Sequence, residues 1–443
     1  MSSVSDWEET TLGAEAELLT GFPFKSERYT ESSDSSPLVR GDNIVQGAMR
    51  WDGVKKWPLT ERGEYELYEL REGDVVLAMD RPWIEAGLKY AAISKHDLPC
   101  LLVQRTARLR GGPKLDIGFL RYLIGSLEFT QHIHAITTGT AVPHISGRQI
   151  KDFAFALPPL AEQKAIAVVL GALDDKIELN RRMNATLEAM ARALFQSWFM
   201  DFDPVRAKLD GRPPAALDPA TAALFPDSFQ DSTFGHIPKG WESGSILRQA
   251  DLLSGGTPKT DVAAYWNGDV PWASAKDVSQ CGEAFLVCTE RTITKQGVDE
   301  SSTKIIPANA TVVVARGATT GRLTMFGHAM AINQTCYGLR SKVGVPFALY
   351  CNARHFIERL VQGGHGSIFD TITTSTFEAT DVLLAPKEVL LAFDKQVTPL
   401  FQQVHANLHQ SRTLATLRDT LLPKLLSGEL SVAGVEPTVE PST

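Results

Sequence analysis

The sequence has few cysteines and no long apolar run, and both absences narrow the class of protein. Its 443 residues include five cysteines, none of which forms a C-x-x-C pair. An odd number of unpaired cysteines is typical of a reducing compartment and argues against a zinc or disulfide framework. No apolar run reaches the about 20 residues that cross a bilayer, and the first residues lack the basic and apolar regions of a signal peptide. We therefore expect a cytoplasmic protein without a membrane segment.

Motifs of nucleotide chemistry are also missing. The sequence contains no G-x-x-x-x-G-K-[ST] phosphate loop and no Asn-Pro-Pro, so it encodes neither an ATP motor nor the motif expected of an adenine or cytosine methyltransferase. Asp152 with Glu162 and Lys164 matches a loose metal-nuclease spacing, but Glu162 lies in the first turn of a predicted helix, where a carboxylate complements the helix dipole. His144 and His365 lie on predicted turns with no acid at triad or metal spacing. We therefore expect neither a catalytic residue nor a metal ligand in this chain.

One helical heptad pattern, in contrast, occurs twice. Steps of four and three residues from Ile166 to Trp198, and from Phe393 to Leu425, meet mostly apolar side chains over more than four heptads. Such a pattern is typical of a coiled coil, and each helix would be about 50 Å long. We expect the two helices to pair. The positions predicted for helix pairing or a partner interface are Glu162, Gln163, Ile166, Leu170, Leu173, Ile177, Asn180, Leu187, Leu194, Phe393, Val397, Leu400, Val404, Asn407, Leu414 and Leu421.

The repeat extends beyond the helices. Residues 37–44, 74–78, 139–146 and 155–158 resemble residues 271–278, 311–315, 366–373 and 383–386. Between the helices, the prolines of residues 203–240 predict a connection without helix. The predicted order is therefore a globular unit at 1–157, a long helix at 158–202, a linker at 203–240, a second unit at 241–386, a distal helix at 387–430 and a disordered tail at 431–443. Short β-branched strands and the predicted helices 116–132 and 346–362 favour an α+β fold with a curved sheet for each unit.

Charge is distributed unevenly along the chain. The net charge of −8 does not suggest a nucleic-acid binder, and residues 1–80 carry 8 basic and 17 acidic side chains. Residues 81–151 carry 10 basic and 4 acidic side chains, and residues 304–359 carry 7 basic and one acidic. The later half of each unit is thus basic and suits a surface that faces phosphates. The alternative interpretation is an ordinary solvated surface balanced by acidic neighbours.

Several loops in these basic segments combine cations, hydroxyls and amides. Arginine can read guanine edges and asparagine or glutamine can pair with adenine, while small residues allow a close approach to phosphate. The alternative for each loop is a β-turn whose residues suit the backbone geometry. The candidates for DNA contact are Arg81, Arg105, Arg108, Arg110, Thr138, Thr140, Thr257, Lys259, Lys276, Arg316, Thr319, Thr320, Arg322, Asn333 and Gln334.

Three segments resemble a known family. Residues 157–166 (LPPLAEQKAI), residues 173–180 (LDDKIELN) and residues 421–430 (LLPKLLSGEL) are similar to the central and distal conserved regions of the specificity subunit of type I restriction-modification systems. Residues 237–241 (IPKGW) resemble the entry to the second target recognition domain of that family. The second helix departs from the pattern, because it begins PKEVLL and lacks the Glu-Gln pair.

The resemblance implies an α+β protein with two globular α/β target recognition domains, separated by two long helices that form an antiparallel coiled coil as a pseudo-twofold repeat. It implies a subunit without an active site that reads double-stranded DNA, one recognition domain for each half of a bipartite site, with the helices setting the spacer. The implied partners are two modification subunits, which bring S-adenosylmethionine and adenine methylation, and two motor-nuclease restriction subunits, which bring ATP and Mg. Two other functions remain open, a stand-alone DNA nuclease at Glu162 and Lys164, and a duplicated protein-binding scaffold without DNA contact.

Overall fold

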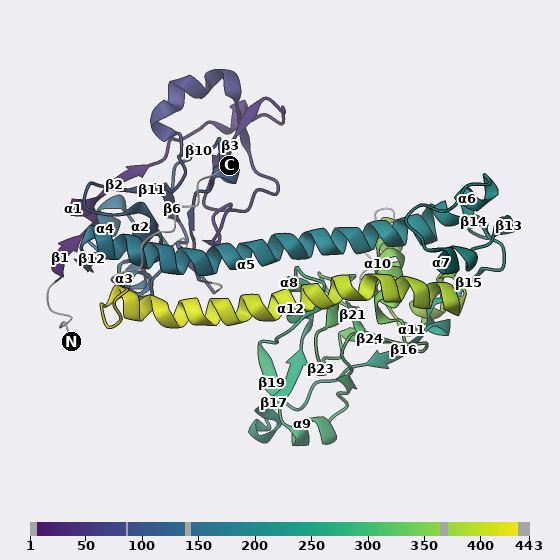
Figure 1. Ribbon diagram of the computed structural model, residues 1–443. Helices are drawn as coiled ribbons and strands as arrows, with labels where there is room; N and C mark the ends of the chain where they lie inside the picture. Colours follow the sequence, from purple (N-terminus) through teal and green to yellow (C-terminus); the bar gives the residue numbers. More distant parts are fainter. Residues whose placement is uncertain (1–6, 86, 138–142, 364–370, 433–443) are drawn as a thin grey trace. The chain divides into compact units, whose positions relative to one another are not determined.

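The computed structural model describes residues 7–85, 87–137, 143–363 and 371–432, and the chain divides into two compact units. The first unit combines Met1–Lys176 with Thr413–Thr443, and the second is Ile177–Arg412. Two long helices, α5 (Leu160–Phe195) and α12 (Lys387–Leu426), each contribute one part to either unit (Figure 1). Each unit therefore contains a domain built on β-sheets together with a stretch of both helices.

A five-stranded sheet forms the centre of the first unit. Its order is β2 (Ala16–Thr20), β11 (Thr106–Gly111), β6 (Val75–Ala78), β9 (Tyr90–Ala92) and β4 (Gln46–Gly47), antiparallel except for the parallel pair β4 and β9. All four residues of the apolar strand β6 are buried. Because successive side chains of a strand point to opposite faces, burial of all four requires cover on both faces of the sheet. Val75 and Leu77 face one core, and Val76 and Ala78 face another. Both faces of this strand are therefore covered.

Helices and a smaller sheet cover these two faces. Residues of α2 (Ile117–Ile124) and α3 (Leu127–Ile136) share the core of Val75 and Leu77. The smaller sheet has the order β10 (Leu101–Leu102), β3 (Ser35–Val39) and β5 (Lys56–Pro58). The other described elements of this domain are α1 (Leu12–Glu15), α4 (Gly147–Lys151), the hairpin of β7 (Trp83–Ile84) and β8 (Gly87–Leu88), and 3-10 turns at Ser26–Arg28, Leu59–Tyr68 and Lys95–Asp97.

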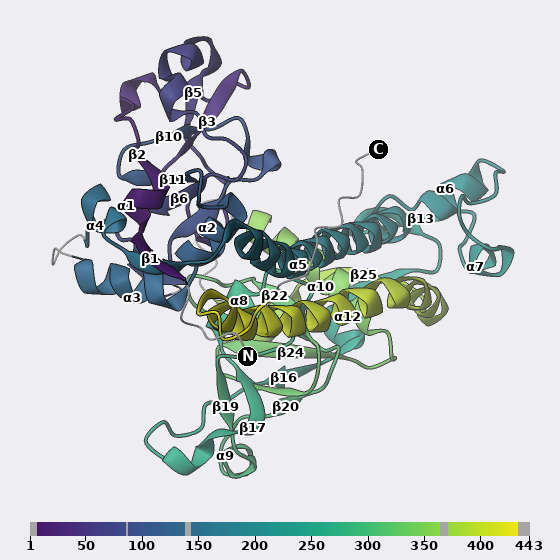
Figure 2. The same ribbon diagram turned by 60° about the vertical axis from the view of Figure 1, so that its left-hand side comes forward.

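The second unit repeats this architecture. Its five-stranded sheet is β16 (Ala250–Ser254), β24 (Cys336–Ser341), β21 (Thr311–Val314), β22 (Leu323–Phe326) and β18 (Phe285–Leu286), again with one parallel pair, β18 and β22, at the same edge. The smaller sheet is β19 (Arg291–Ile293), β17 (Trp266–Ala273), β23 (Met330–Ile332) and β20 (Ile305–Ile306), and it lies on the side of the unit away from α12 (Figures 1 and 2). The predicted internal repeat is confirmed.

Strand register shows that the repeat holds residue by residue. In the smaller sheets, Val39 lies opposite Leu102 and Ala273 lies opposite Ile332, both in parallel pairs. The alignment of residues 37–44 with residues 271–278 predicts this correspondence. The helices of the second domain are α8 (Ala275–Gln280), α9 (Lys295–Asp299), α10 (Pro346–Gly363) and α11 (Thr374–Ala379), with 3-10 turns at Ile246–Arg248 and Ala263–Tyr265.

A short antiparallel strand pair closes each domain. β1 (Glu8–Thr11) pairs with β12 (Ala154–Leu157), and β15 (Glu242–Ser245) pairs with β25 (Asp381–Leu384). Prolines follow β12 and β25, and the long helices begin at Leu160 and Lys387. Proline suits this place because its missing N–H has no partner in the first turn of a helix. The first strand of each domain therefore lies beside its last strand, which leads into the long helix.

The two long helices run antiparallel in the first unit. Ile166 and Leu170 from the start of α5 share a core with Leu425 from the end of α12. Arg418 Nη1 lies 2.7 Å from Asp174 Oδ1, and Asp174 also accepts a hydrogen bond from Tyr122 of α2 at 2.7 Å. Asp174 of α5 therefore connects α12 to α2.

The helices are also antiparallel in the second unit, where aromatic rings and asparagines meet. Phe393 near the start of α12 packs on Trp198 beyond the end of α5, with ring centroids 5.6 Å apart. The heptad positions of the two helices form the contact between them, which is called the seam. Asn180 and Asn407 are buried in this seam. No position of either heptad series is exposed. The predicted antiparallel coiled coil is confirmed, with a π-helical turn at Gln196–Met200 as the end of the first helix.

The prediction of a helix-free linker over residues 203–240 is wrong. This segment contains α6 (Asp203–Leu209), α7 (Pro219–Ala223) and a hairpin of β13 (Phe229–Ser232) and β14 (Gly235–Pro238). Pro204 and Pro219 lie in the first turns of their helices, where proline is tolerated. Phe225 is buried against Trp198 and Trp241. The segment is therefore a folded part of the second unit.

Two other boundaries also differ from prediction. The expected helix 116–132 is two helices, α2 and α3, because Ser126 caps the second one by accepting a hydrogen bond from Phe129 N at 3.1 Å. Residues 433–443 of the expected disordered tail lie outside the described residues. The start of that tail is held in place, since Ser431 Oγ and Val432 N donate to Glu162 Oε1 at 3.0 and 3.1 Å.

Candidate nucleic-acid interface

Three of the predicted binding loops lie together at the edge of the main sheet of the second unit that is formed by the ends of its strands. They are residues 254–259 after β16, residues 315–322 between β21 and β22, and residues 333–335 between β23 and β24. Gly256 N donates to Ile332 O at 2.9 Å, and Ala315 N donates to Thr335 O at 2.8 Å. Thr257 Oγ1 also donates to Gln334 Oε1. Hydrogen bonds therefore hold the three loops as one surface.

The first unit has the same edge, built by the same hydrogen bonds. Phe22 N donates to Leu102 O at 3.1 Å, and Met79 N donates to Arg105 O at 2.9 Å. These bonds correspond to those of Gly256 and Ala315 in the second unit. The correspondence aligns two pairs of loop positions, Gln104 with Gln334 and Arg105 with Thr335.

A glycine in each unit permits the close approach of these loops. A Cβ atom on Gly21 would lie 2.1 Å from Val103 O, and one on Gly255 would lie 2.2 Å from Asn333 O. No side chain fits at such distances, so only glycine allows the end of β2 or β16 to touch the loop that carries the glutamine. The glycines therefore fix the same loop position in both units.

In the first unit this edge forms a charged recess of about 460 Å³. Arg105 Nη1 contacts Asp80 Oδ2 at 2.8 Å, and His144 Nδ1 lies 2.7 Å from Asp80 Oδ1. The acid that His144 contacts is 64 residues away in sequence, so no local spacing reveals it, and the imidazole is partly exposed and hydrogen-bonded. His365 lies outside the described residues. The side chains that line the recess are Tyr29, Arg40, Asp42, Asp80, Arg81, Lys89, Val103, Gln104 and Arg105.

Lys89 is a half-buried cation of this recess. Its burial lowers the pKa of the ammonium group, Asp42 opposes that effect, and Arg50 and Arg81 add to it. Sequence reasoning missed Lys89 and Arg40, which both line the recess. Lys89 and Arg322 occupy equivalent positions in the repeat, since the carbonyl oxygen of Lys89 accepts from Ala78 N and that of Arg322 accepts from Val314 N. The repeat could therefore have identified Lys89.

The corresponding edge of the second unit carries exposed arginines. Arg316 and Arg322 are both exposed, and within the described part of the chain neither has an ion-pair partner. Thr319 is exposed, whereas Thr320 Oγ1 donates to Gly317 O at 2.7 Å within the loop. Lys259 is exposed at the neighbouring loop. The structure thus brings most of the candidates of the second unit to one surface.

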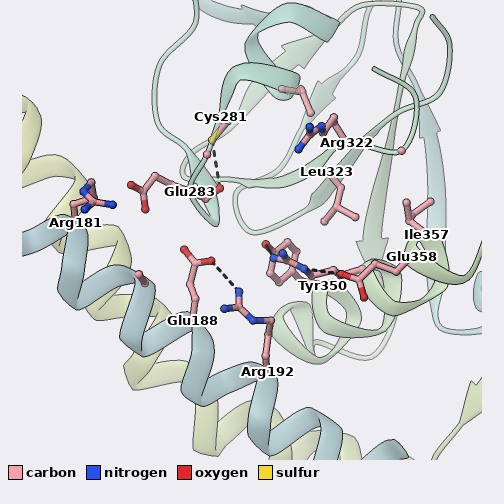
Figure 3. Close-up of a pocket in the computed structure, with 15 residues that line it drawn as sticks. Arg181, Glu188, Arg192, Cys281, Glu283, Arg322, Leu323, Tyr350, Ile357 and Glu358 are labelled. Atoms are coloured by element: carbon pink, nitrogen blue, oxygen red, sulfur yellow. Dashed lines mark hydrogen bonds and ion pairs between the residues drawn. The ribbon is translucent and has the colours of Figure 1, made fainter. Parts of the chain in front are cut away.

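Arg322 also lines a recess of about 440 Å³ between the second domain and α5 of the same unit (Figure 3). Arg181 and Arg192 of α5 line the same space, as does Arg354 of α10. Glu188 of α5 accepts a hydrogen bond from Ala284 N at 3.0 Å, and burial raises its pKa. The cations of this recess are thus mixed with a carboxylate that ties the domain to the helix.

Two predicted DNA contacts in the first unit are wrong. Arg108 lies on the central part of β11, is 2% exposed and forms an ion pair with Glu17 of β2. Arg110 on the same face contacts the buried Asp74 through two bonds, Nε to Oδ1 at 2.7 Å and Nη2 to Oδ2 at 2.8 Å. Both guanidinium groups are therefore used inside the domain.

The remaining predicted DNA contacts have varied surroundings. Asn333 is 9% exposed, and its Oδ1 accepts from Thr335 N and Oγ1, so it shapes the loop. Lys276 is exposed and forms an ion pair of 2.9 Å with Glu290. Arg81 is exposed and lines the recess of the first unit. Thr138 and Thr140 lie outside the described residues.

Two residues in the first turn of α5, Glu162 and Gln163, face their own unit. Gln163 is fully buried; its Oε1 accepts from Asp116 N at 2.8 Å, and its Nε2 donates to Lys114 O and Pro158 O at 2.9 and 2.7 Å. The prediction of a partner contact is wrong for Gln163, because every polar atom of its amide is bonded within the chain. Glu162 receives the two bonds from Ser431 and Val432 given above.

The seam residues of the second unit include a polar layer. Asn180 Nδ2 donates to Gln410 Oε1 at 2.9 Å and to Ser411 Oγ at 3.2 Å, while Asn180 Oδ1 is buried without a partner in the described part of the chain. Asn407 Nδ2 donates to Asn184 Oδ1 at 2.9 Å. The other predicted seam residues are buried or half-buried.

Comparisons with known proteins point to one family. The family model described as type I restriction modification DNA specificity domain matches residues 4–189 and residues 238–414, once for each repeat. The chain is 28% identical over 360 residues to the specificity subunit of the type I restriction enzyme HindI from Haemophilus influenzae, which covers 70% of this chain and 77% of that one. It is 25% identical over 390 residues to the MjaIX specificity subunit from Methanocaldococcus jannaschii, which covers 84% and 82%.

A solved structure shows the same fold. The S subunit of a type I restriction-modification system from M. genitalium matches with a TM-score of 0.57 and 14% sequence identity, over 95% of this chain and 96% of that one. No helix in the described residues is long and apolar enough to cross a membrane. Because the family model matches both repeats over most of their length, the chain belongs to the family of type I restriction-modification DNA specificity subunits.

Proposed function

We propose that each unit reads one half of a bipartite DNA site through the loops at the edge of its main sheet. The observation that supports this is a pair of equivalent surfaces with unlike charges. Asp80 in the first unit corresponds to Arg316 in the second, since each forms the bridge to the segment before α4 or α11. Asp42 likewise corresponds to Lys276 in the aligned segments after β3 and β17.

Unlike side chains on one scaffold suit unlike half-sites. Arginine pairs with the O6 and N7 atoms of guanine, whereas aspartate accepts from the amino group of cytosine. A change from Asp80 to Arg316 at one loop position therefore selects different bases while the backbone stays the same. A shared cation at Lys89 and Arg322 suits the DNA backbone, whose phosphates are common to every sequence.

The long helices suit the role of a spacer element. Each domain is closed by a strand pair and continues directly into α5 or α12, and the two helices pair in each unit. A rigid pair of helices holds a set separation between two reading surfaces far better than a flexible linker. The helices would thus set the length of DNA between the two half-sites.

The chemistry of modification and cleavage would come from partner chains. We propose a complex with two modification subunits, which bind S-adenosylmethionine and methylate adenine, and two restriction subunits, which use ATP and Mg for translocation and cleavage. This chain would be the non-catalytic reader and scaffold. The alternative nuclease at Glu162 is disfavoured because Glu162 Oε1 is occupied by Ser431 and Val432 of the same chain.

Methylation mapping tests the proposal. The chain would be expressed with its modification subunits in a host that lacks other adenine methyltransferases, and methylated adenines would be located across the genome. The expected motif has two specific halves with a gap of fixed length. A continuous motif, or an unmethylated genome when all subunits are present, contradicts bipartite reading. The alternative function is a protein-binding scaffold without DNA contact. It would be indicated by binding whose affinity does not fall with added salt, because DNA binding weakens as salt is added.

A further inference from the structure

One exposed side chain is the same at the equivalent place of both reading surfaces. Gln104 follows Val103, whose N–H donates to Val39 O at 3.1 Å, and Gln334 follows Asn333, whose N–H donates to Ala273 O at 3.0 Å. Both glutamines are exposed. Their neighbours differ, since Arg105 corresponds to Thr335. The glutamine is therefore retained where the surrounding charges change.

The backbone places both glutamines in the same way. Gly21 and Gly255 approach the loops so closely that a Cβ atom at either would overlap a main-chain oxygen. The residues after the glutamines are also fixed, because the carbonyl oxygens of Arg105 and Thr335 accept from Met79 N and Ala315 N at 2.9 and 2.8 Å. Each glutamine thus projects from a loop that is fixed on both sides.

The amides themselves are suited to an external partner. Within the described part of the chain the side chain of Gln104 has no hydrogen-bond partner, and it lines the charged recess of the first unit. Gln334 Oε1 accepts from Thr257 Oγ1, which fixes the orientation of the amide and leaves Nε2 as its donor. An amide oxygen has two lone pairs, so Oε1 keeps one acceptor site.

A glutamine amide matches adenine in the major groove. It can donate from Nε2 to N7 and accept at Oε1 from the N6 amino group, and this bidentate pairing excludes the other bases. We infer that Gln104 and Gln334 each read the adenine of an A·T pair at the same position of the two half-sites, counted from the spacer. The two half-sites therefore share this one A·T pair and differ at other positions. This inference rests on the proposed function.

The test is DNA selection with the assembled complex of this chain and its modification subunits. Randomised duplexes are selected by the wild-type complex and by complexes that carry Gln104→Ala or Gln334→Ala. We expect an A·T pair at one equivalent position in each half for the wild type. Each variant should lose about tenfold to a hundredfold of the preference at that position in its own half only, as for loss of a bidentate contact.

Controls separate this inference from the proposed function. Gln131→Ala on α3 and Gln296→Ala on α9 remove exposed glutamines away from the two loops and should leave both halves of the motif unchanged. Failure of the wild-type complex to select any bipartite motif contradicts the proposed function itself. A bipartite motif whose preferences do not respond to the two variants, or which has different base pairs at the two equivalent positions, overturns the inference alone. A Thr257→Ala variant should weaken the preference in the second half only, because Thr257 orients Gln334.

Discussion

Asn407 Nδ2 donates a hydrogen bond of 2.9 Å to Oδ1 of Asn184, and both side chains are buried where α12 meets α5 in the second unit. The hydrogen bond between these two buried side chains forms only when the two helices meet at one register. A slip of either helix would bury the amides among apolar side chains without partners, which costs about 1 to 3 kcal/mol for each group. The polar layer therefore selects the register of the helix pair.

Substitution of Asn407 by leucine should destabilise the second unit, whereas the same change at Asn180 should not. Asn407→Leu leaves Asn184 Oδ1 buried without a donor and should lower the free energy of unfolding by about 1 to 3 kcal/mol. Asn180→Leu removes an oxygen that is already unpaired, and Gln410 and Ser411, which lose its Nδ2 donor, are exposed and half-buried, so water can replace that donor. Chemical denaturation measures both changes. The double variant Asn184→Leu/Asn407→Leu should recover stability, and no recovery would contradict the pairing.

At Asn180, loss of register selectivity should appear in the gap between the half-sites and not in the free energy of unfolding. With Asn180→Leu we expect a less well-defined gap between the half-sites in methylation mapping, because the helices can then pair in more than one way. The stoichiometry of the complex is measured alongside by mass spectrometry. If gap length and stoichiometry both remain as in the wild type, the polar layer does not set the register.

Removal of the two exposed arginines of the second unit should weaken DNA binding in a salt-dependent way. Arg316→Ala/Arg322→Ala deletes two cations that have no ion-pair partner among the described residues. Each lost phosphate contact should reduce the slope of log affinity against log salt by about one. Titration of labelled duplex at several salt concentrations measures the slope. Arg212→Ala, which removes an exposed ion pair with Asp210 in the segment after α5, serves as the matched control.

The contact of Gln163 with the first domain should be important for stability. Gln163→Ala leaves Asp116 N, Lys114 O and Pro158 O without their side-chain partner, and we expect a loss of roughly 2 kcal/mol or more in the free energy of unfolding. The neighbouring Lys164→Ala, at an exposed position, should be neutral. Equal effects of the two variants would show that the amide contributes little.

Stability of the second unit should depend on the ionisation of Glu188. Burial raises the pKa of this carboxyl above its ordinary value of 4.5, so the folded chain binds more protons than the unfolded chain between the two pKa values. The free energy of unfolding therefore falls as the pH rises from 4.5 through the raised pKa. Denaturation of wild type and Glu188→Gln across this interval measures the difference. The variant, which cannot ionise, should lack this part of the decline; parallel curves would contradict it.

The paired helices could be predicted from sequence because their pattern is local. Every heptad position from Ile166 to Trp198 and from Phe393 to Leu425 is buried or half-buried, as the period alone predicts. The repeat of strands could also be predicted, since β6 and β21 keep the same apolar pattern. Both features depend on residues close together in the chain.

The candidate site could be predicted only in part, because its residues depend on strand register. Arg108 and Arg110 read as a basic loop in sequence, but pairing of β11 with β2 and β6 brings Glu17 and Asp74 to them. Those acids lie far away in the chain, so no local pattern reveals the ion pairs. Gln104, in contrast, could have been found by extending the repeat alignment through Gln334.

The strand pairs that close each domain have an evolutionary consequence. Because β1 lies beside β12, and β15 beside β25, the chain enters and leaves each domain at neighbouring points. An exchange of the intervening coding sequence would replace all loops of the candidate interface in that domain and leave the strand that leads into the long helix in place. In the first domain the incoming segment has only to present the main-chain groups that Gln163 binds. If each domain reads one half-site, as proposed, such a chain can acquire a new half-site by recombination while the gap between the halves is inherited unchanged.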